Sequence, residues 1–154
     1  MKIISFLLVS YLITFACVAK ENKIHFDYDT FVEKYFSSWT ESQKPDATKE
    51  NIDQYLSLLA DDVAHQHIPY DMTDKREPNG KQVIRDGMLH WLGANTKYRA
   101  KLISFTTGYN VVVIKYKEIS QGVSNGNVIN IVRDNIEVLE LENGKVTVIR
   151  KYGK

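Results

Sequence analysis

The C-terminal third of the chain decides the fold, in the stretch VINIVRDNIEVLELE (residues 128–142), followed by NG (143–144) and KVTVIRKY (145–152). β-Branched residues dominate both flanking segments, and Asn-Gly is a strong signal for a tight turn between antiparallel strands. Residues 98–107 alternate between apolar and polar side chains, and 111–119 form a nearly continuous β-branched run. These patterns predict a mostly antiparallel sheet, and strands of this length must twist.

The first half of the chain predicts three helices, because apolar residues recur there at intervals of three and four. The first begins near Thr30, which has capping-box spacing to the acidic residue three positions later. Thr48 caps the second, which should end near Asp62 because carboxylates are disfavoured at a helix C-terminus. Gly80 opens the third helix, and Gly93 ends it.

Shorter features complete the expected architecture. Residues 65–68 suit an edge strand that ends at Pro69, and residues 121–127 suit a loop. Gly87 lies inside the apolar face of the third helix, where we expect a close contact between this helix and the sheet. Because helices precede strands, the order favours an α+β fold over a parallel α/β sheet. Three helices packed on a curled sheet form a cone open at one end, and that opening is the expected pocket.

The N-terminus predicts export. Residues 1–19 contain one basic residue, an apolar run and small residues before charges begin at Lys20. This pattern is typical of a signal peptide, and its apolar run is short for a membrane span. We expect cleavage after Ala19, a flexible arm over 20–27, one domain over 28–154, and a periplasmic or secreted protein.

Two alternatives for this segment remain open. One is an uncleaved membrane anchor. The other is a bacterial lipoprotein, cut before Cys17 and anchored by lipid on that cysteine. Ala16 suits the position before such a cut, whereas Thr14 stands where these motifs usually have leucine.

Composition excludes several kinds of partner. The chain has 154 residues, with 20 basic and 19 acidic side chains and a single cysteine. Loss of residues 1–19 removes Lys2 and Cys17, which leaves 19 basic and 19 acidic residues. A mature chain without net charge has no long-range attraction for nucleic acid or anionic lipid. A chain of this length needs no disulfide for stability, and its sequence carries no phosphate-binding loop and no nucleophile motif. We therefore expect no cofactor, and no membrane span once residues 1–19 are removed.

The long strand over 128–142 carries the clearest polar anomaly. Its alternation places Arg133, Asn135 and Glu137 on the same face as Leu139 and Leu141, which look like core residues. Desolvation would tune Glu137 for acid or base chemistry in the pocket. The alternatives are an ion pair between Glu137 and Arg133, or a strand face turned to solvent.

Two further residues are candidates for proton chemistry. His65 and His67 have metal-ligand spacing, but no motif supplies a third ligand, so we expect no metal and favour His67 alone at the pocket mouth. The alternative is an exposed edge histidine. Tyr35 lies in the apolar stripe of the first helix, either as a core residue or as a hydroxyl donor into the pocket. The expected pocket-lining residues are Trp39, Tyr55, Trp91, Phe105, Arg133 and Asn135.

Three strings, in this order and spacing, resemble the nuclear transport factor 2-like superfamily: YLSLLADDV (55–63), GKQVIR (80–85) and EVLELENGKV (137–146). The superfamily includes SnoaL-like polyketide cyclases and ketosteroid isomerases. The resemblance covers residues 28–152 and implies one SnoaL-like domain with a cystatin-like cone. The fold hosts enzymes, binders and assembly modules, so the resemblance does not select an activity.

The resemblance also implies roles for three residues. In ketosteroid isomerases a tyrosine of the first helix donates a hydrogen bond to the developing oxyanion, and Tyr35 stands at that place. The general-base aspartate of those enzymes matches His67, and a second carboxylic acid matches Glu137. Histidine in place of aspartate departs from the family pattern and puts isomerase activity itself in doubt.

Two functions therefore remain open. The first is an exported protein that binds a small apolar molecule and performs cofactor-free acid/base chemistry of the isomerase, cyclase or lyase type. The second is a non-catalytic ligand-binding or association module. The outward face of the 128–142 strand mixes apolar Ile136 and Val138 with Asp134 and Glu140, which fits either solvent or a homodimer interface.

Overall fold

A computed structural model of the protein describes residues 26–153. The expected signal peptide, the cysteine at position 17 and most of the N-terminal arm lie outside the described residues. No helix within 26–153 is long and apolar enough to cross a membrane.

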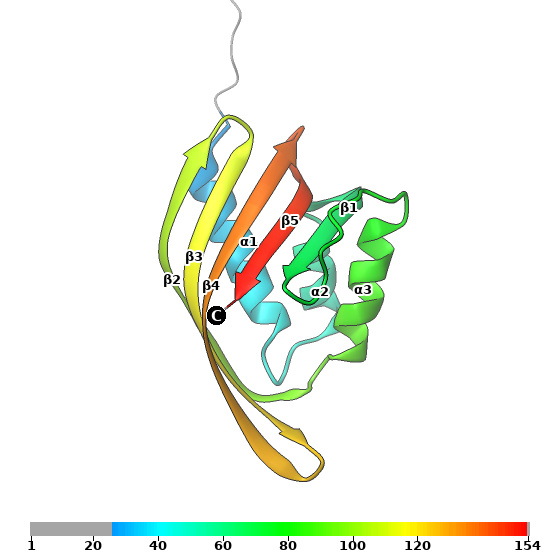
Figure 1. Cartoon of the computed structure of the whole chain (residues 1–154), viewed down its shortest axis with the longest axis vertical. Helices are drawn as coiled ribbons and strands as arrows, with labels where there is room; N and C mark the ends of the chain where they lie inside the picture. The colour runs from blue at the N-terminus through cyan, green and yellow to red at the C-terminus, as the bar shows by residue number, and fades with distance from the viewer. Residues whose placement is uncertain (1–25, 154) are drawn as a thin grey trace, which may run out of the picture.

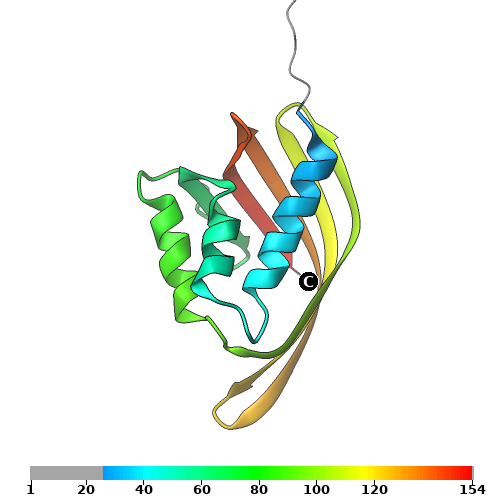
Figure 2. The ribbon, with the colours of Figure 1, turned by 180° about the vertical axis from the view of Figure 1, so that it is seen from behind.

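Three helices lie on one face of a five-stranded, unclosed sheet, as Figures 1 and 2 show from opposite sides. The strand order is β1-β5-β4-β3-β2, with β1 parallel to β5 and every other neighbouring pair antiparallel. This arrangement confirms the predicted α+β fold. In chain order the elements are α1 (Tyr28–Ser42), α2 (Lys49–Leu56), β1 (Leu59–Ile68), α3 (Gly80–His90), β2 (Asn95–Gly108), β3 (Val111–Ser124), β4 (Asn127–Glu142) and β5 (Lys145–Gly153).

Helix α1 begins earlier than predicted. Its N-cap is Asp27, whose carboxylate accepts hydrogen bonds from the backbone N–H and the hydroxyl of Thr30 at 3.0 and 2.7 Å. The predicted cap at Thr30 is therefore wrong, because aspartate is an equally good N-cap and stands one turn upstream. At α2 the predicted cap is correct, and Asn51 completes the capping box with Thr48.

The larger error concerns the chain after α2. The prediction continued this helix to about Asp62, whereas α2 ends at Leu56 and strand β1 begins at Leu59. The strand carries an irregularity between Leu59 and Ala64 in its pairing with β5. The spacing of four between the buried Leu59 and Val63 fits one face of a strand as well as one face of a helix, which is why the pattern was ambiguous. The irregularity itself appears as two adjacent buried residues, Val63 and Ala64.

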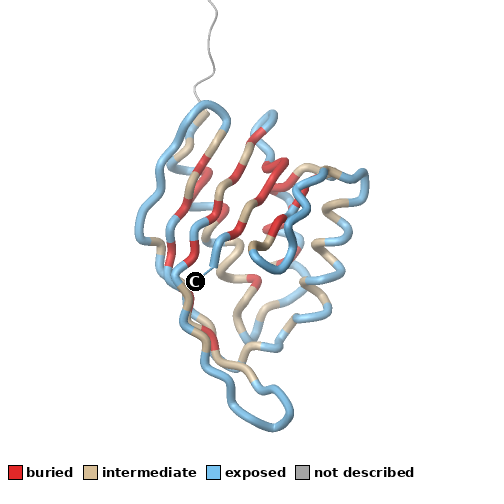
Figure 3. Tube along the Cα trace, in the orientation of Figure 1, coloured by how far each residue is buried: buried red, intermediate tan, exposed pale blue. Residues whose placement is uncertain are grey.

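The hairpin of β3 and β4 is longer than predicted. Residues expected to form a loop over 121–127 are instead paired strands that meet at Asn125 and Gly126, with φ angles of 51° and 77°. Asn143 and Gly144 form the predicted β4–β5 turn with φ angles of 50° and 75°. The hairpin projects beyond the helices, and its far end is largely exposed (Figures 1 and 3).

The core lies between the helices and the middle of the sheet, where the buried positions of the central strands alternate (Figure 3). Tyr35 on α1, Ile52 on α2 and Ile114 on β3 are almost completely buried there. Gly80, at the start of α3, marks the closest approach of a helix to the sheet. A Cβ atom on Gly80 would lie 2.1 Å from the carbonyl oxygen of Val63.

Gly87 does not make the predicted close contact. A Cβ atom on Gly87 would meet nothing within 4 Å, because this residue faces a cavity. The tight helix–strand packing thus depends on the glycine at the start of α3, where the backbones of α3 and β1 touch.

These two glycines provide a matched test of the packing. We expect Gly80→Ala to lower the free energy of unfolding by about 1–3 kcal/mol, because the new methyl group displaces backbone. Gly87→Ala should raise it by about 0.5–1 kcal/mol, since alanine favours the helix interior and meets no neighbour. Urea denaturation followed by circular dichroism measures both. Changes of the same sign would contradict the assignment of the close contact.

Candidate functional site

A cavity of about 840 Å³ lies between the sheet, α1, α3 and the segment 71–79 that connects β1 to α3. Its apolar wall includes Trp39 from α1 and Ile84 and Met88 from α3. The strands contribute polar side chains: His65 and His67 on β1, Glu118 on β3, Arg133 on β4 and Lys151 on β5. The 71–79 segment adds five more polar residues, Asp71, Thr73, Lys75, Glu77 and Asn79. The cavity therefore has an apolar side supplied mainly by helices and a polar side supplied by the strands and this segment.

Lys151 is the centre of the polar side. Its ammonium nitrogen lies 3.8 Å from Glu118 Oε2 and 3.9 Å from Glu137 Oε1, and the three side chains are at most 9% exposed. The ammonium also lies over the rings of Trp39 and Tyr116, 4.9 and 5.7 Å from their centroids. Two carboxylates and two aromatic faces thus compensate one buried positive charge.

Glu137 is held from behind by tyrosine hydroxyls. Tyr116 donates to Glu137 Oε1 at 2.7 Å, Tyr35 donates to Oε2 at 3.2 Å, and Tyr55 lies 3.2 Å from the Tyr35 oxygen. Burial, followed by the charge of Glu137, raises the pKa of both Tyr35 and Tyr116. These phenols therefore keep their protons at neutral pH and act as donors to the carboxylate.

The sequence hypothesis places both Tyr35 and Glu137 in the pocket, whereas in the structure the two are in contact but neither lines the cavity. Tyr35 is 1% exposed and Glu137 is 4% exposed. Lys151 touches Glu137 and does line the cavity. The influence of Glu137 on a molecule in the cavity would therefore pass through Lys151.

His67 lies on the cavity wall, as the parallel neighbour of Lys151 across β1 and β5. Burial lowers the pKa of His67, and the nearby charges of Lys151 and Arg133 lower it further. His65 also lines the cavity and is partly exposed there, and partial burial likewise lowers its pKa. The two imidazole rings lie 6.2 Å apart, and the described residues form no group of three potential metal ligands.

Four of the six predicted wall residues line the cavity: Trp39, Tyr55, Trp91 and Arg133. Phe105 and Asn135 do not. Phe105 is 37% exposed on β2, the edge of the sheet farthest from β1. Asn135 is fully buried beneath the site and donates from Nδ2 to Glu118 Oε2 at 3.2 Å.

Sequence reasoning missed Glu118 and Lys151. The signal was present, because Glu118 follows Val112, Ile114 and Tyr116 at every second position of β3, and all four are buried. Lys151 follows Ile149 in the same way on β5. The alternation argument that singled out Glu137 on β4 would have found both residues on the neighbouring strands.

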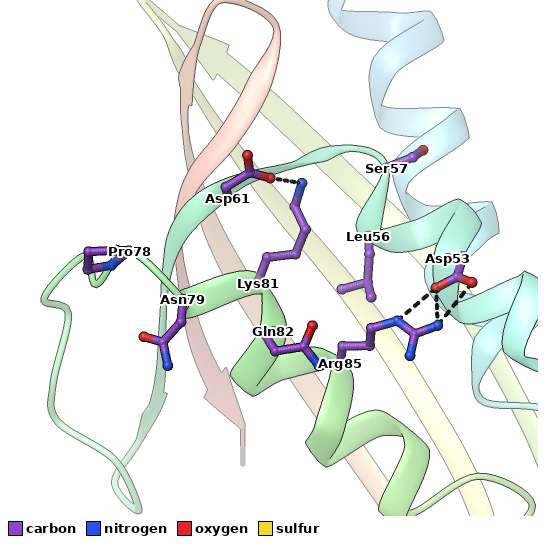
Figure 4. A pocket seen from close by; sticks show the side chains of 9 residues that line it. All are labelled: Asp53, Leu56, Ser57, Asp61, Pro78, Asn79, Lys81, Gln82 and Arg85. Carbon is purple, nitrogen blue, oxygen red and sulfur yellow. Dashed lines mark hydrogen bonds and ion pairs between the residues drawn. The ribbon is translucent and has the colours of Figure 1, made fainter.

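A second, shallower hollow of about 430 Å³ is lined by residues of α2, β1 and α3 and by the two residues before α3 (Figure 4). Lys81 points to Asp61 there at 2.6 Å, and Arg85 points to Asp53 at 2.9 Å. These charged groups satisfy one another across the hollow. The larger cavity is therefore the stronger candidate for a functional site.

No family model and no curated protein sequence matches this chain. Solved structures do match. A proposed SnoaL-like polyketide cyclase from Shewanella denitrificans OS-217 is 12% identical, with a TM-score of 0.66 over 82% of this chain and 89% of the other. A protein of Catenulispora acidiphila DSM 44928 with a ketosteroid isomerase-like fold, in complex with trimethylamine, is 13% identical, with a TM-score of 0.57 over 79% and 83%.

An LEH-like epoxide hydrolase of M. tuberculosis is 14% identical, with a TM-score of 0.57 over 81% of this chain and 84% of the other. At sequence identities this low, the structural similarity shows a shared fold and does not show a shared activity. The chain has the nuclear transport factor 2-like fold.

Proposed function

We propose that this protein binds a small, largely apolar molecule in the cavity and moves a proton on it without a cofactor. One observation carries the proposal: a buried ammonium group, fixed between two carboxylates, borders an apolar cavity of ligand size. An enzyme with such a site would belong to the isomerase, cyclase or lyase type.

Within this proposal His67 accepts the proton. Its lowered pKa keeps the imidazole neutral at pH 7, and its ring makes no hydrogen bond within the described residues. Lys151 stabilises the negative charge that develops on the molecule. Glu118 and Glu137 hold Lys151 in place, and Tyr35 acts through Glu137, so these are positioning residues.

Proteins of similar fold support this class of function, although each name concerns that protein alone. They include a proposed polyketide cyclase, an epoxide hydrolase and a protein that holds the small molecule trimethylamine. All place their chemistry on a fold shared with this chain at 12–14% identity.

A proton-transfer probe tests the proposal without knowledge of the natural substrate. In 5-nitrobenzisoxazole a base removes the C3 proton, the N–O bond breaks, and 2-cyano-4-nitrophenolate forms. We expect the protein to accelerate this reaction and His67→Gln to lower the rate about tenfold or more. Below pH 6.5 the wild-type rate should fall as pH falls through the lowered pKa of His67, because the protonated imidazole is no base. Phenolate absorbance measures the rate.

His90→Gln is the matched control, because His90 is exposed at the end of α3 and does not line the cavity. This variant should keep the wild-type rate. If the His67→Gln variant reacts at the wild-type rate while the Glu118→Gln variant does not accelerate the reaction, the assignment of His67 as the base is wrong. If neither substitution changes the rate, the acid/base proposal fails.

A second candidate function is association through the outer face of the sheet. Val132, Ile136 and Tyr152 are 61%, 42% and 40% exposed there, and Ile136 and Tyr152 are cross-strand neighbours. The same face carries the ion pair Lys117–Asp134 at 3.6 Å. Because basic residues of β3 lie beside acidic residues of β4, a two-fold axis would bring opposite charges together, so we propose a second copy of this chain as the occupant.

Sedimentation velocity tests this association. The wild type should sediment as a dimer at micromolar concentration, and Val132→Glu should sediment as a monomer, because it places a charge in the apolar patch. Tyr109→Glu is the control, since Tyr109 is 94% exposed in the β2–β3 turn, away from that patch. A monomeric wild type would exclude the candidate interface.

We also propose that the protein is exported and cleaved after Ala19. Intact-mass analysis of protein purified from its own host should find Lys20 as the first residue. A chain that begins at a lipid-modified Cys17 would identify a lipoprotein instead. A chain that retains residues 1–19 would contradict cleavage altogether.

A further inference from the structure

One charged donor on the sheet side of the cavity has no acceptor. Arg133 lines the cavity and is partly buried, yet its guanidinium makes no hydrogen bond or ion pair within residues 26–153. A guanidinium offers five donors in a fork that matches a carboxylate. Its charge is felt in the site, because it contributes to the lowered pKa of His67.

The carboxylate on the strand position opposite Arg133 has other partners. Glu118 is the cross-strand neighbour of Arg133, but its Oε2 accepts from Asn135 and faces Lys151 at 3.8 Å. Glu137 is likewise committed to Tyr35, Tyr116 and Lys151. The protein therefore supplies two carboxylates to Lys151 and none to Arg133.

Two other donors nearby are buried without a partner. The indole N–H of Trp39 and the hydroxyl of Tyr98 make no hydrogen bond. The two side chains lie close enough for Trp39 to lower the pKa of Tyr98, but the indole N–H and the Tyr98 hydroxyl are not placed to form a hydrogen bond with each other. Buried donors without acceptors are costly, so a ligand acceptor beside Trp39, which lines the cavity, would relieve the cost at its indole N–H. Within the described part of the chain, Thr40 Oγ1 and Asn135 Oδ1 are also buried without a partner.

We infer that the molecule bound in the cavity is an apolar monocarboxylate, whose carboxylate pairs with Arg133 and whose body lies against Trp39, Met88 and Trp91. This inference rests on the proposed function and names the ligand class of the same site. A monoanion fits better than a dianion such as a phosphate monoester, because Glu118 adjoins Arg133 and would repel the second charge. A cationic ligand is disfavoured, because each carboxylate of the wall already has a donor within the protein: Glu118 faces Lys151, Glu77 pairs with Lys75, and Asp71 accepts from the backbone N–H of Thr73.

Isothermal titration with 2-naphthoate and its neutral isostere 2-naphthamide tests the inference on the mature chain at pH 7.5. We expect 2-naphthoate to bind about tenfold or more tightly than 2-naphthamide, as charge-assisted bidentate bonds outweigh neutral ones. In Arg133→Gln this preference should fall to about one. Arg133→Lys keeps the charge without the fork and should give an intermediate preference.

Two controls separate the possible outcomes. Arg99→Gln should retain the preference, because Arg99 is exposed on β2 and does not line the cavity. Gly87→Trp should abolish binding of both probes, because its side chain enters the cavity where a Cβ meets no neighbour. Unchanged circular dichroism spectra establish that each variant is folded.

Equal affinity for the two probes in the wild type, or a preference that persists in Arg133→Gln, would overturn the carboxylate inference and leave the proposed cavity intact. Failure of both probes to bind, or binding that Gly87→Trp does not affect, would overturn the cavity as a ligand site and the inference with it.

Discussion

The burial of the Lys151 ammonium is the constraint on which the site depends. Removing an ion from water costs several kcal/mol, so the charge is tolerated only where carboxylates and aromatic faces surround it. Glu118 and Glu137 reach Lys151 from two neighbouring strands. A one-residue slip of β4 or β5 would turn Glu137 or Lys151 to the opposite face of the sheet. The Asn143–Gly144 turn and the register shift between Glu140 and Leu141 together set the β4–β5 pairing at these two residues, so both features determine the site as well as the fold.

The same cluster joins the site to the hydrophobic core. Tyr35 belongs to the apolar stripe of α1, yet its hydroxyl reaches Glu137 on β4. Tyr116 packs edge-on against Phe36 and donates to the same carboxylate. An apolar substitution at Glu137 would leave two buried phenols without this acceptor and the Lys151 ammonium with one carboxylate instead of two, and so would change stability together with any chemistry. Residues that border the cavity but make fewer core contacts, such as His67, are better positions at which to separate the two effects.

Local patterns were sufficient to predict most of the fold from sequence. Alternation and Asn-Gly turns located β4 and β5, and the Thr48 cap located α2. The pattern failed at β1, because the buried Leu59 and Val63 are four residues apart, a spacing that fits a helix as well as a strand. The cluster around Glu137 could be predicted only in part, because alternation identifies which residues share a face but not which of them reach one another. Alternation would have placed Lys151 on the buried face, but its contacts with Glu137 and Glu118 arise from register with β4 and from reach toward β3.

Different forces hold the two sides of the cavity. The sheet side is fixed by strand pairing and by the buried Lys151 cluster. In the segment 71–79 the odd-numbered residues line the cavity. Two of the even-numbered residues hold the segment to the sheet through ion pairs: Asp74 pairs with Arg150, and Arg76 pairs with Asp62 and Glu142. Such partly exposed ion pairs contribute little each and weaken with salt. The sheet side is therefore the more firmly held of the two, and the segment, whose lining side chains are all polar, is the part of the wall that can adjust to a molecule in the cavity.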